Sequence, residues 1–117
     1  MSTLSKTVHV VGERQSGKSS MVALIMASYL GNGKLICLVD IMQEHAHFHL
    51  RRFNLSPKEI VIMGVTRAID HSFSAFDLVV LENFSHYTAE QRWQVKALIK
   101  RCEDIGANVR FILVEES

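Results

Sequence analysis

The segment from Gly12 to Ser19 constrains the fold more than any other part of this 117-residue chain. It reads Gly-Glu-Arg-Gln-Ser-Gly-Lys-Ser, with two glycines that frame a short loop and with Lys18 and Ser19 directly after the second one. Glycines let the backbone curl so that its N–H groups point inward, and a helix that starts there adds its positive dipole end. A buried strand must lead into such a loop and a helix must lead out of it.

Each position of this loop has an expected role in holding a chain of phosphates. Lys18 would reach the β- and γ-phosphates, and the Ser19 hydroxyl would ligate Mg²⁺. The sequence therefore predicts a nucleoside triphosphate with Mg²⁺ as the ligand. The residues predicted to bind it are Gly12, Glu13, Arg14, Gln15, Ser16, Gly17, Lys18, Ser19 and Ser20.

Strands and helices are expected to alternate along the first half of the chain. Thr7–Val11 is a β-branched run that suits a strand buried in a parallel sheet. A helix should run from near Gly17 to about Leu30, and its apolar residues lie nearly all round, as expected of a helix packed among other elements. Lys34–Asp40 reads as a second buried strand, and residues 41–52 as a short helix.

The segment Leu55–Gly64 supports two interpretations. Ser56-Pro57-Lys58-Glu59 resembles a helix start, whereas the following Ile60–Met63 is β-branched and favours a third strand. We favour the strand. The last predicted elements are a strand at Phe76–Glu82, a helix from the capping box Thr88–Gln91 to about Ile105, and a strand at Val109–Val114.

This alternation predicts an α/β fold, a three-layer α/β/α sandwich with a mainly parallel sheet of about five strands. The length suits a single domain over residues 1–117. Trp93 and the apolar positions of the last helix are expected in the core. Cys37 and Cys102 lie in apolar stretches without metal-like spacing, so we expect buried free thiols in a reducing compartment.

A metal beside the phosphates also needs a carboxylate on a neighbouring strand. Glu82 is the first candidate, because it follows the apolar run Leu78–Leu81 at the carboxyl end of a strand. Asp40 and Glu44, at or just after the end of the second strand, are further candidates for catalysis. A solvated or capping role is an equally good interpretation of these two carboxylates.

With these residues the chain resembles a minimal P-loop NTPase core, with Walker A at residues 12–19 and a Walker B-like segment at 77–83. Within that superfamily it looks most like the RecA-like ATPase branch, because the Walker B-like strand comes late and a helix and a strand follow it. The resemblance implies a three-layer fold, ATP with Mg²⁺, and oligomers in which a neighbour completes the site. One departure concerns Asn83, which stands where this branch often has a proton-accepting Glu.

The choice of ATP rests on two missing motifs. Guanine-specific members of the superfamily carry Asn-Lys-x-Asp and Asp-x-x-Gly, and neither occurs in this sequence. We therefore expect adenine to be the base.

Charge and hydropathy narrow the partners. Lys and Arg number 13 against 12 Asp and Glu, so no general field draws the chain to nucleic acid or to an anionic membrane. Arg51-Arg52 and Lys100-Arg101 leave nucleic-acid binding open without indicating it. No apolar run approaches the roughly 18 residues of a membrane span, so a cytoplasmic location is expected. His45, His47 and His49 match no complete metal motif and favour a polar surface.

Three functions fit these residues. The leading one is a small ATP-binding protein, a slow Mg-dependent ATPase that acts as a nucleotide-driven switch or assembly factor on itself or on a protein partner. The second is a kinase for a nucleoside or metabolite, with its acceptor pocket within residues 41–75. The third is a regulatory or structural module that binds nucleotide without turnover, which Asn83 favours.

Overall fold

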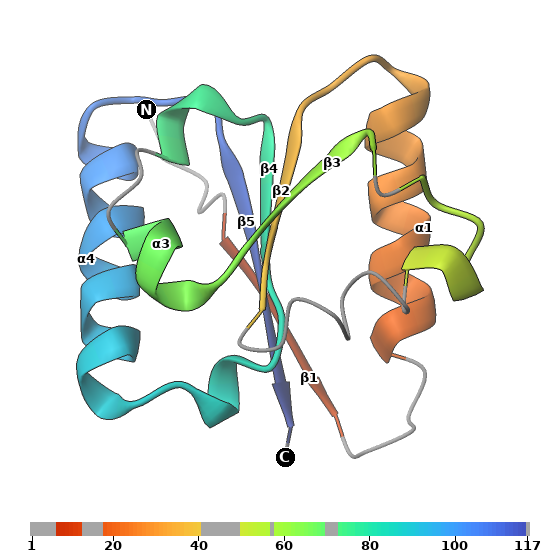
Figure 1. Cartoon of the computed structure of the whole chain (residues 1–117). Helices are drawn as coiled ribbons and strands as arrows, with labels where there is room; N and C mark the ends of the chain where they lie inside the picture. The colour runs from red at the N-terminus through yellow and green to blue at the C-terminus, as the bar shows by residue number, and fades with distance from the viewer. Residues whose placement is uncertain (1–6, 13–17, 41–49, 57, 70–72, 117) are drawn as a thin grey trace.

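A computed structural model describes residues 7–12, 18–40, 50–56, 58–69 and 73–116, and its centre is a five-stranded sheet (Figure 1). Every pairing is parallel, and the strand order is β1-β5-β4-β2-β3. The strands are β1 (Thr7–Gly12), β2 (Ile36–Val39), β3 (Ile60–Met63), β4 (Leu78–Leu81) and β5 (Arg110–Glu116). The third strand, favoured from the sequence, is confirmed.

Helices cover both faces of the sheet, so the predicted three-layer α/β/α sandwich is confirmed. Helix α1 (Lys18–Gly31) lies on one face, and α3 (Val65–Ile69) and α4 (Ala89–Asp104) lie on the other (Figure 1). Two 3-10 helices, η1 (Phe73–Ala75) and η2 (Phe84–His86), flank β4. Among the described residues, no helix has the length and apolar character that crossing a membrane requires.

The neighbouring inner strands β2 and β4 are buried at every position, which explains their unbroken apolar sequence. Successive side chains point to opposite faces of a strand. Ile36 and Leu38 accordingly join the core beneath α1, whereas Cys37 and Val39 join the core beneath α3 and α4. The sheet therefore separates two hydrophobic cores, one on each face.

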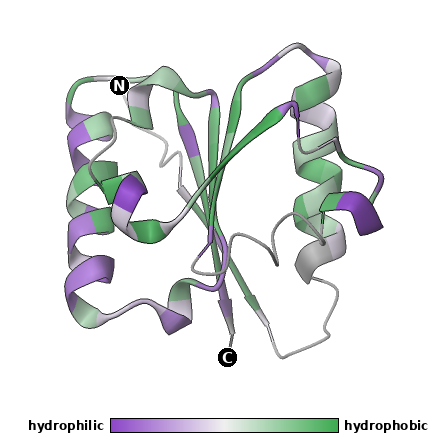
Figure 2. Ribbon diagram, viewed as in Figure 1, coloured by the Kyte–Doolittle hydropathy of each residue, from purple (hydrophilic) through white to green (hydrophobic). Residues whose placement is uncertain are grey.

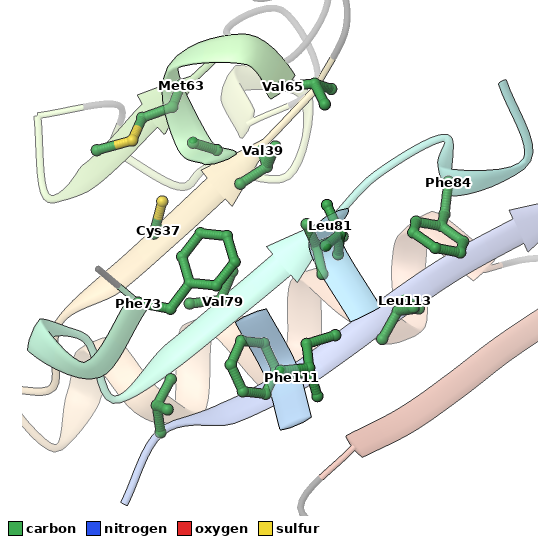
Figure 3. Packing of buried hydrophobic residues seen from close by; sticks show 14 of the residues in the cluster. Cys37, Val39, Met63, Val65, Phe73, Val79, Leu81, Phe84, Phe111 and Leu113 are labelled. Atoms are coloured by element: carbon green, nitrogen blue, oxygen red, sulfur yellow. The ribbon is translucent and has the colours of Figure 1, made fainter. Parts of the chain in front are cut away.

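Aromatic rings fill the core on the α4 side (Figure 3). Phe73 and Phe111 meet edge to face, with ring centroids 5.7 Å apart and an interplanar angle of 65°. The ring centroids of Phe84 and Tyr87 lie 5.1 Å apart, in the segment between β4 and α4. Such contacts fix how the segments around β4 pack on the sheet.

The predicted capping box is present at the start of α4. The Thr88 hydroxyl accepts a hydrogen bond from the Gln91 backbone N–H at 3.1 Å, and the Gln91 side chain accepts one from the Thr88 N–H at 2.9 Å. The helix ends at Asp104, one residue before the predicted Ile105. Both ends of α4 are thus encoded in local sequence.

Three predictions about burial are wrong. The strand at Thr7–Val11, expected to be buried, is the edge strand β1, and its Val8 and Val11 are 53% and 56% exposed because only one other strand flanks it. Met21 and Leu24 of α1 are 47% and 73% exposed, because α1 is an outer layer of the sandwich and only its inner face packs on the sheet. Trp93, expected in the core, is 71% exposed. It lies across α4 from the buried Val95 and Ile99, so the helix presents it to solvent.

Candidate functional site

Strand β1 leads into the Gly12–Ser19 segment, and helix α1 leads out of it. β1 ends at Gly12, and α1 begins at Lys18, so the predicted strand and helix flank the loop segment. Lys18, Ser19 and Ser20 form the first turn of α1, where the helix dipole is positive. The two elements meet at the carboxyl edge of the sheet, where open α/β sheets bind ligands.

Glu82 directly follows β4 at the same edge. Strand β5 lies between β1 and β4, and neighbouring strands are about 4.8 Å apart, so Glu82 follows a strand about 10 Å from the one that leads into the loop. The Glu82 N–H donates to the Val39 carbonyl at 2.9 Å, which anchors its backbone to β2. The residue is half-buried, so it belongs neither to the core nor to the open surface.

Asp40 lies next to this position, at the end of β2. It is 1% exposed, and its backbone N–H donates to the Met63 carbonyl at 3.0 Å. Burying a carboxylate is costly unless hydrogen bonds compensate. The Asn83 side-chain amide supplies one, donating from Nδ2 to Asp40 Oδ1 at 3.0 Å. Asn83, noted in the sequence only as a missing base, thus has a structural task.

The backbone of Asn83 adopts a rare conformation. Its φ of 54° and ψ of 39° lie in the left-handed region, which asparagine tolerates better than most residues. The turn ends β4 and starts η2, and it leaves the amide within reach of Asp40. Asparagine therefore suits both the left-handed backbone at position 83 and the hydrogen bond to Asp40.

Tyr87 completes the cluster and was not predicted from the sequence. It is 3% exposed, and its hydroxyl donates to the Val39 carbonyl at 3.4 Å. Burial, followed by the negative charges of Asp40 and Glu82, raises the pKa of Tyr87 well above its usual value. The hydroxyl therefore stays protonated, and both carboxylates lie close enough to act on it. The available sequence signal was its place just before a capping box, where an apolar residue often packs inward.

At this edge of the sheet Glu82 could supply one ligand to a metal ion. In the described part of the chain, no group of three or more His, Cys, Asp or Glu side chains could hold a metal ion. Magnesium is commonly bound by one or two carboxylates, with water and substrate phosphates completing the shell. Glu82 at this edge fits that pattern, because the phosphates would supply the remaining ligands.

Several predicted residues cannot be compared with the structure. The predicted residues that lie outside the described part of the chain are Glu13, Arg14, Gln15, Ser16, Gly17, Glu44, His45, His47 and His49. For Lys18 and Ser19 only the helical backbone is described. Cys37 and Cys102, by contrast, are buried free thiols as predicted. Burial raises the pKa of the Cys37 thiol to about 12, so it is inert at neutral pH.

Comparison with known proteins supports the fold. No family model matches the chain, and no curated protein matches it. Among solved structures it is similar to a KaiC-like protein from the archaeon Pyrococcus horikoshii, with a TM-score of 0.68 and 17% identity, over 95% of this chain and 61% of that one. It is also similar to SulA from Pseudomonas aeruginosa, with a TM-score of 0.61 and 12% identity, over 97% of this chain and 100% of that one. At such low identity these likenesses establish the shared fold alone.

Proposed function

We propose that this chain binds ATP with Mg²⁺ at the carboxyl edge of its sheet and hydrolyses it slowly, as a nucleotide-driven switch or assembly factor. The observation that carries the proposal is the Gly12–Ser19 sequence, which runs from the end of β1 to the start of α1. The fold shared with a KaiC-like protein supports the proposal. The carboxylates of Asp40 and Glu82 at the same edge support it further, because a bound triphosphate would require a cation beside them.

The roles of the chain's own residues follow from this arrangement. The loop amides and Lys18 bind and orient the phosphates. Ser19 and Glu82 would hold the magnesium and its water shell, and magnesium when bound would offset the negative charge that develops on the phosphoryl oxygens. These contacts stabilise the transferring phosphoryl group without any covalent step on the protein.

Asp40 is the proposed acceptor of the proton from the attacking water. The hydrogen bond from Asn83 holds its carboxylate in one orientation. Because Asp40 is only 1% exposed, an attacking water has little access to its carboxylate, which is why slow turnover is expected. Glu44 stays a second candidate for this role.

The burial of Asp40 also favours one alternative, a module that binds nucleotide without turnover. If Asp40 serves only to tie β2 to β4 through Asn83, the site would retain ATP and not hydrolyse it. The two functions differ in product formation and not in binding.

Phosphate release from MgATP tests the proposal. We expect Lys18→Ala to lower turnover at least about a hundredfold, because it removes a charge-assisted contact to the transferring group. Asp40→Asn should lower kcat with little change in KM if Asp40 accepts the proton. Lys34→Ala, at an exposed turn after α1, is the matched control.

The result of this assay distinguishes a slow ATPase from a module that binds nucleotide without turnover. Binding with no phosphate release would identify the non-hydrolysing module. Turnover that Lys18→Ala and Lys34→Ala leave equally unchanged would contradict an active site at this loop.

A further inference from the structure

The outward face of α4 carries a concentration of positive charge. Between Gln91 and Cys102 the chain has four cations and no acidic residue, although the whole sequence is nearly neutral. The acidic residues of α4 are confined to its ends. Figure 2 shows hydrophilic residues along the side of α4 that faces away from the sheet. The cations are Arg92, Lys96, Lys100 and Arg101.

Three of these cations form a row. Arg92, Lys96 and Lys100 recur every four residues, so they share one side of the helix, with a rise of about 6 Å from each to the next. Like charges at this spacing destabilise an isolated helix. No ion pair joins any of the four cations to a carboxylate in the described part of the chain. The row therefore opposes helix stability, which favours a role in binding.

A large aromatic ring lies beside the row. Trp93 is 71% exposed, and it is the one tryptophan in the sequence. It follows Arg92 directly and stands four residues before Ala97 and eight before Arg101, on the solvent side of α4. An exposed indole next to several cations combines the two features that single-stranded nucleic acid requires, a stacking platform and charges along the backbone.

We propose that this face of α4 binds single-stranded nucleic acid. The phosphates would lie along Arg92, Lys96 and Lys100, and an unpaired base would stack on Trp93. Charge complementarity supports this ligand, because a regularly spaced row of cations suits a polymer with regularly spaced negative charges. A single strand is favoured over a duplex, because paired bases do not expose their faces to an indole. The proposal does not depend on nucleotide binding at the sheet edge.

Lys100 and Arg101 are the better targets for testing the charge. The Lys96 ammonium lies 5.9 Å from the centroid of the buried Phe84 ring, so its replacement would also disturb packing. Lys100 and Arg101 are exposed and lack such a contact among the described residues. Lys100→Glu with Arg101→Glu therefore changes the surface and leaves the core intact. Lys34→Glu with Lys58→Glu, two exposed lysines outside α4, is the control of equal charge.

Binding is measured without ATP, using oligothymidylate and oligouridylate of about 12 nucleotides, close to the length one such site covers. Anisotropy of a labelled strand gives the affinity, and quenching of the Trp93 fluorescence reports stacking. We expect binding with quenching, weakened at least about tenfold by Trp93→Ala and by the Lys100/Arg101 double variant. Raising the salt from about 50 to about 200 mM should weaken it about twentyfold, because three phosphate contacts on a single strand give a slope of about −2 for log affinity against log salt. The Lys34/Lys58 variant should bind like the wild type.

Other results overturn the proposal. Absence of binding by either strand at micromolar protein would do so, as would binding without quenching. Equal losses in the Lys100/Arg101 and Lys34/Lys58 variants would show nonspecific attraction. Displacement of the strand by polyglutamate at equal charge concentration would point to an acidic protein partner.

Discussion

Asn83 meets two demands at once, a left-handed backbone and a hydrogen bond to a buried carboxylate. Another asparagine, Asn54, has nearly the same φ, 58°, but it is exposed. Substitutions at these two asparagines therefore separate the free-energy cost of the left-handed backbone from the cost of losing the hydrogen bond to Asp40. Neither contribution is visible in the sequence, because both depend on where the chain turns.

Glycine and alanine substitutions at these two positions should change the free energy of unfolding by different amounts. Asn54→Gly should change the free energy of unfolding little, whereas Asn83→Gly should lower it by about 1 to 3 kcal/mol, because it leaves Asp40 without that partner. Alanine at either position should cost about 1 kcal/mol more than glycine does, owing to the positive φ. Urea unfolding of the four variants gives the values. Equal effects of glycine at both positions would mean that the bond to Asp40 contributes nothing.

Cys37 gives a pH-dependent prediction. Burial raises its pKa from 9.0 to about 12, with Arg67 opposing the change. Below pH 9 the thiol is protonated in both states, so its contribution to stability is fully present. As the pH rises towards 12, the unfolded chain releases the proton and the folded chain does not, so stability falls by about 1.4 kcal/mol per pH unit.

The measurement compares the wild type with Cys37→Ala at pH 8 and pH 11. The variant should be less stable at pH 8, because its side chain leaves a cavity. Its loss of unfolding free energy between the two pH values should be smaller than that of the wild type by about 3 kcal/mol. Parallel losses would show that the thiol is not protected by burial.

At the scale of elements, α4 shows what local sequence determines. Its start was predicted because the capping box lies in four consecutive residues, and its length because apolar residues recur along one side. Helix α3 was not predicted, since five residues are too few to show a periodicity. The prediction that Trp93 lies in the core was wrong because it followed from the apolar character of the residue alone. The helical spacing puts Trp93 opposite the buried Val95.

The cap can be tested by itself. Thr88→Ala removes the acceptor for the Gln91 N–H and should lower the free energy of unfolding by about 1 kcal/mol. Thr66→Ala, at an exposed position inside α3, is the control and should have little effect. Thermal unfolding of both variants measures the difference. Similar melting temperatures for the two would contradict a stabilising capping box.

At the scale of the whole molecule, the sheet unites segments that the sequence keeps apart. β1 pairs with β5, with Thr7 opposite Phe111, and β2 lies between β3 and β4. The alternation of elements predicted a parallel sheet in three layers but not this strand order, since two of the pairings, β1 with β5 and β2 with β4, join strands that are not consecutive in the chain.

One part of the candidate site could be predicted from the sequence, and the other part could not. The loop residues and Glu82 could be named from a local pattern and a strand end. The contact between Asp40 and Asn83, and the buried Tyr87 beside them, follow from the pairing of β2 with β4 and so required the structure. The site thus combines a local motif with a contact that only the sheet creates.

We propose that MgATP binds at the loop between β1 and α1, and calorimetric titration of MgATP into the purified chain measures this binding. We expect binding by the wild type and by Lys34→Ala, and an affinity at least about tenfold lower for Lys18→Ala, which corresponds to about 1.4 kcal/mol. Omitting Mg²⁺ should weaken binding to the wild type as well. Equal affinity in all three proteins, or no binding by the wild type, would contradict the claim.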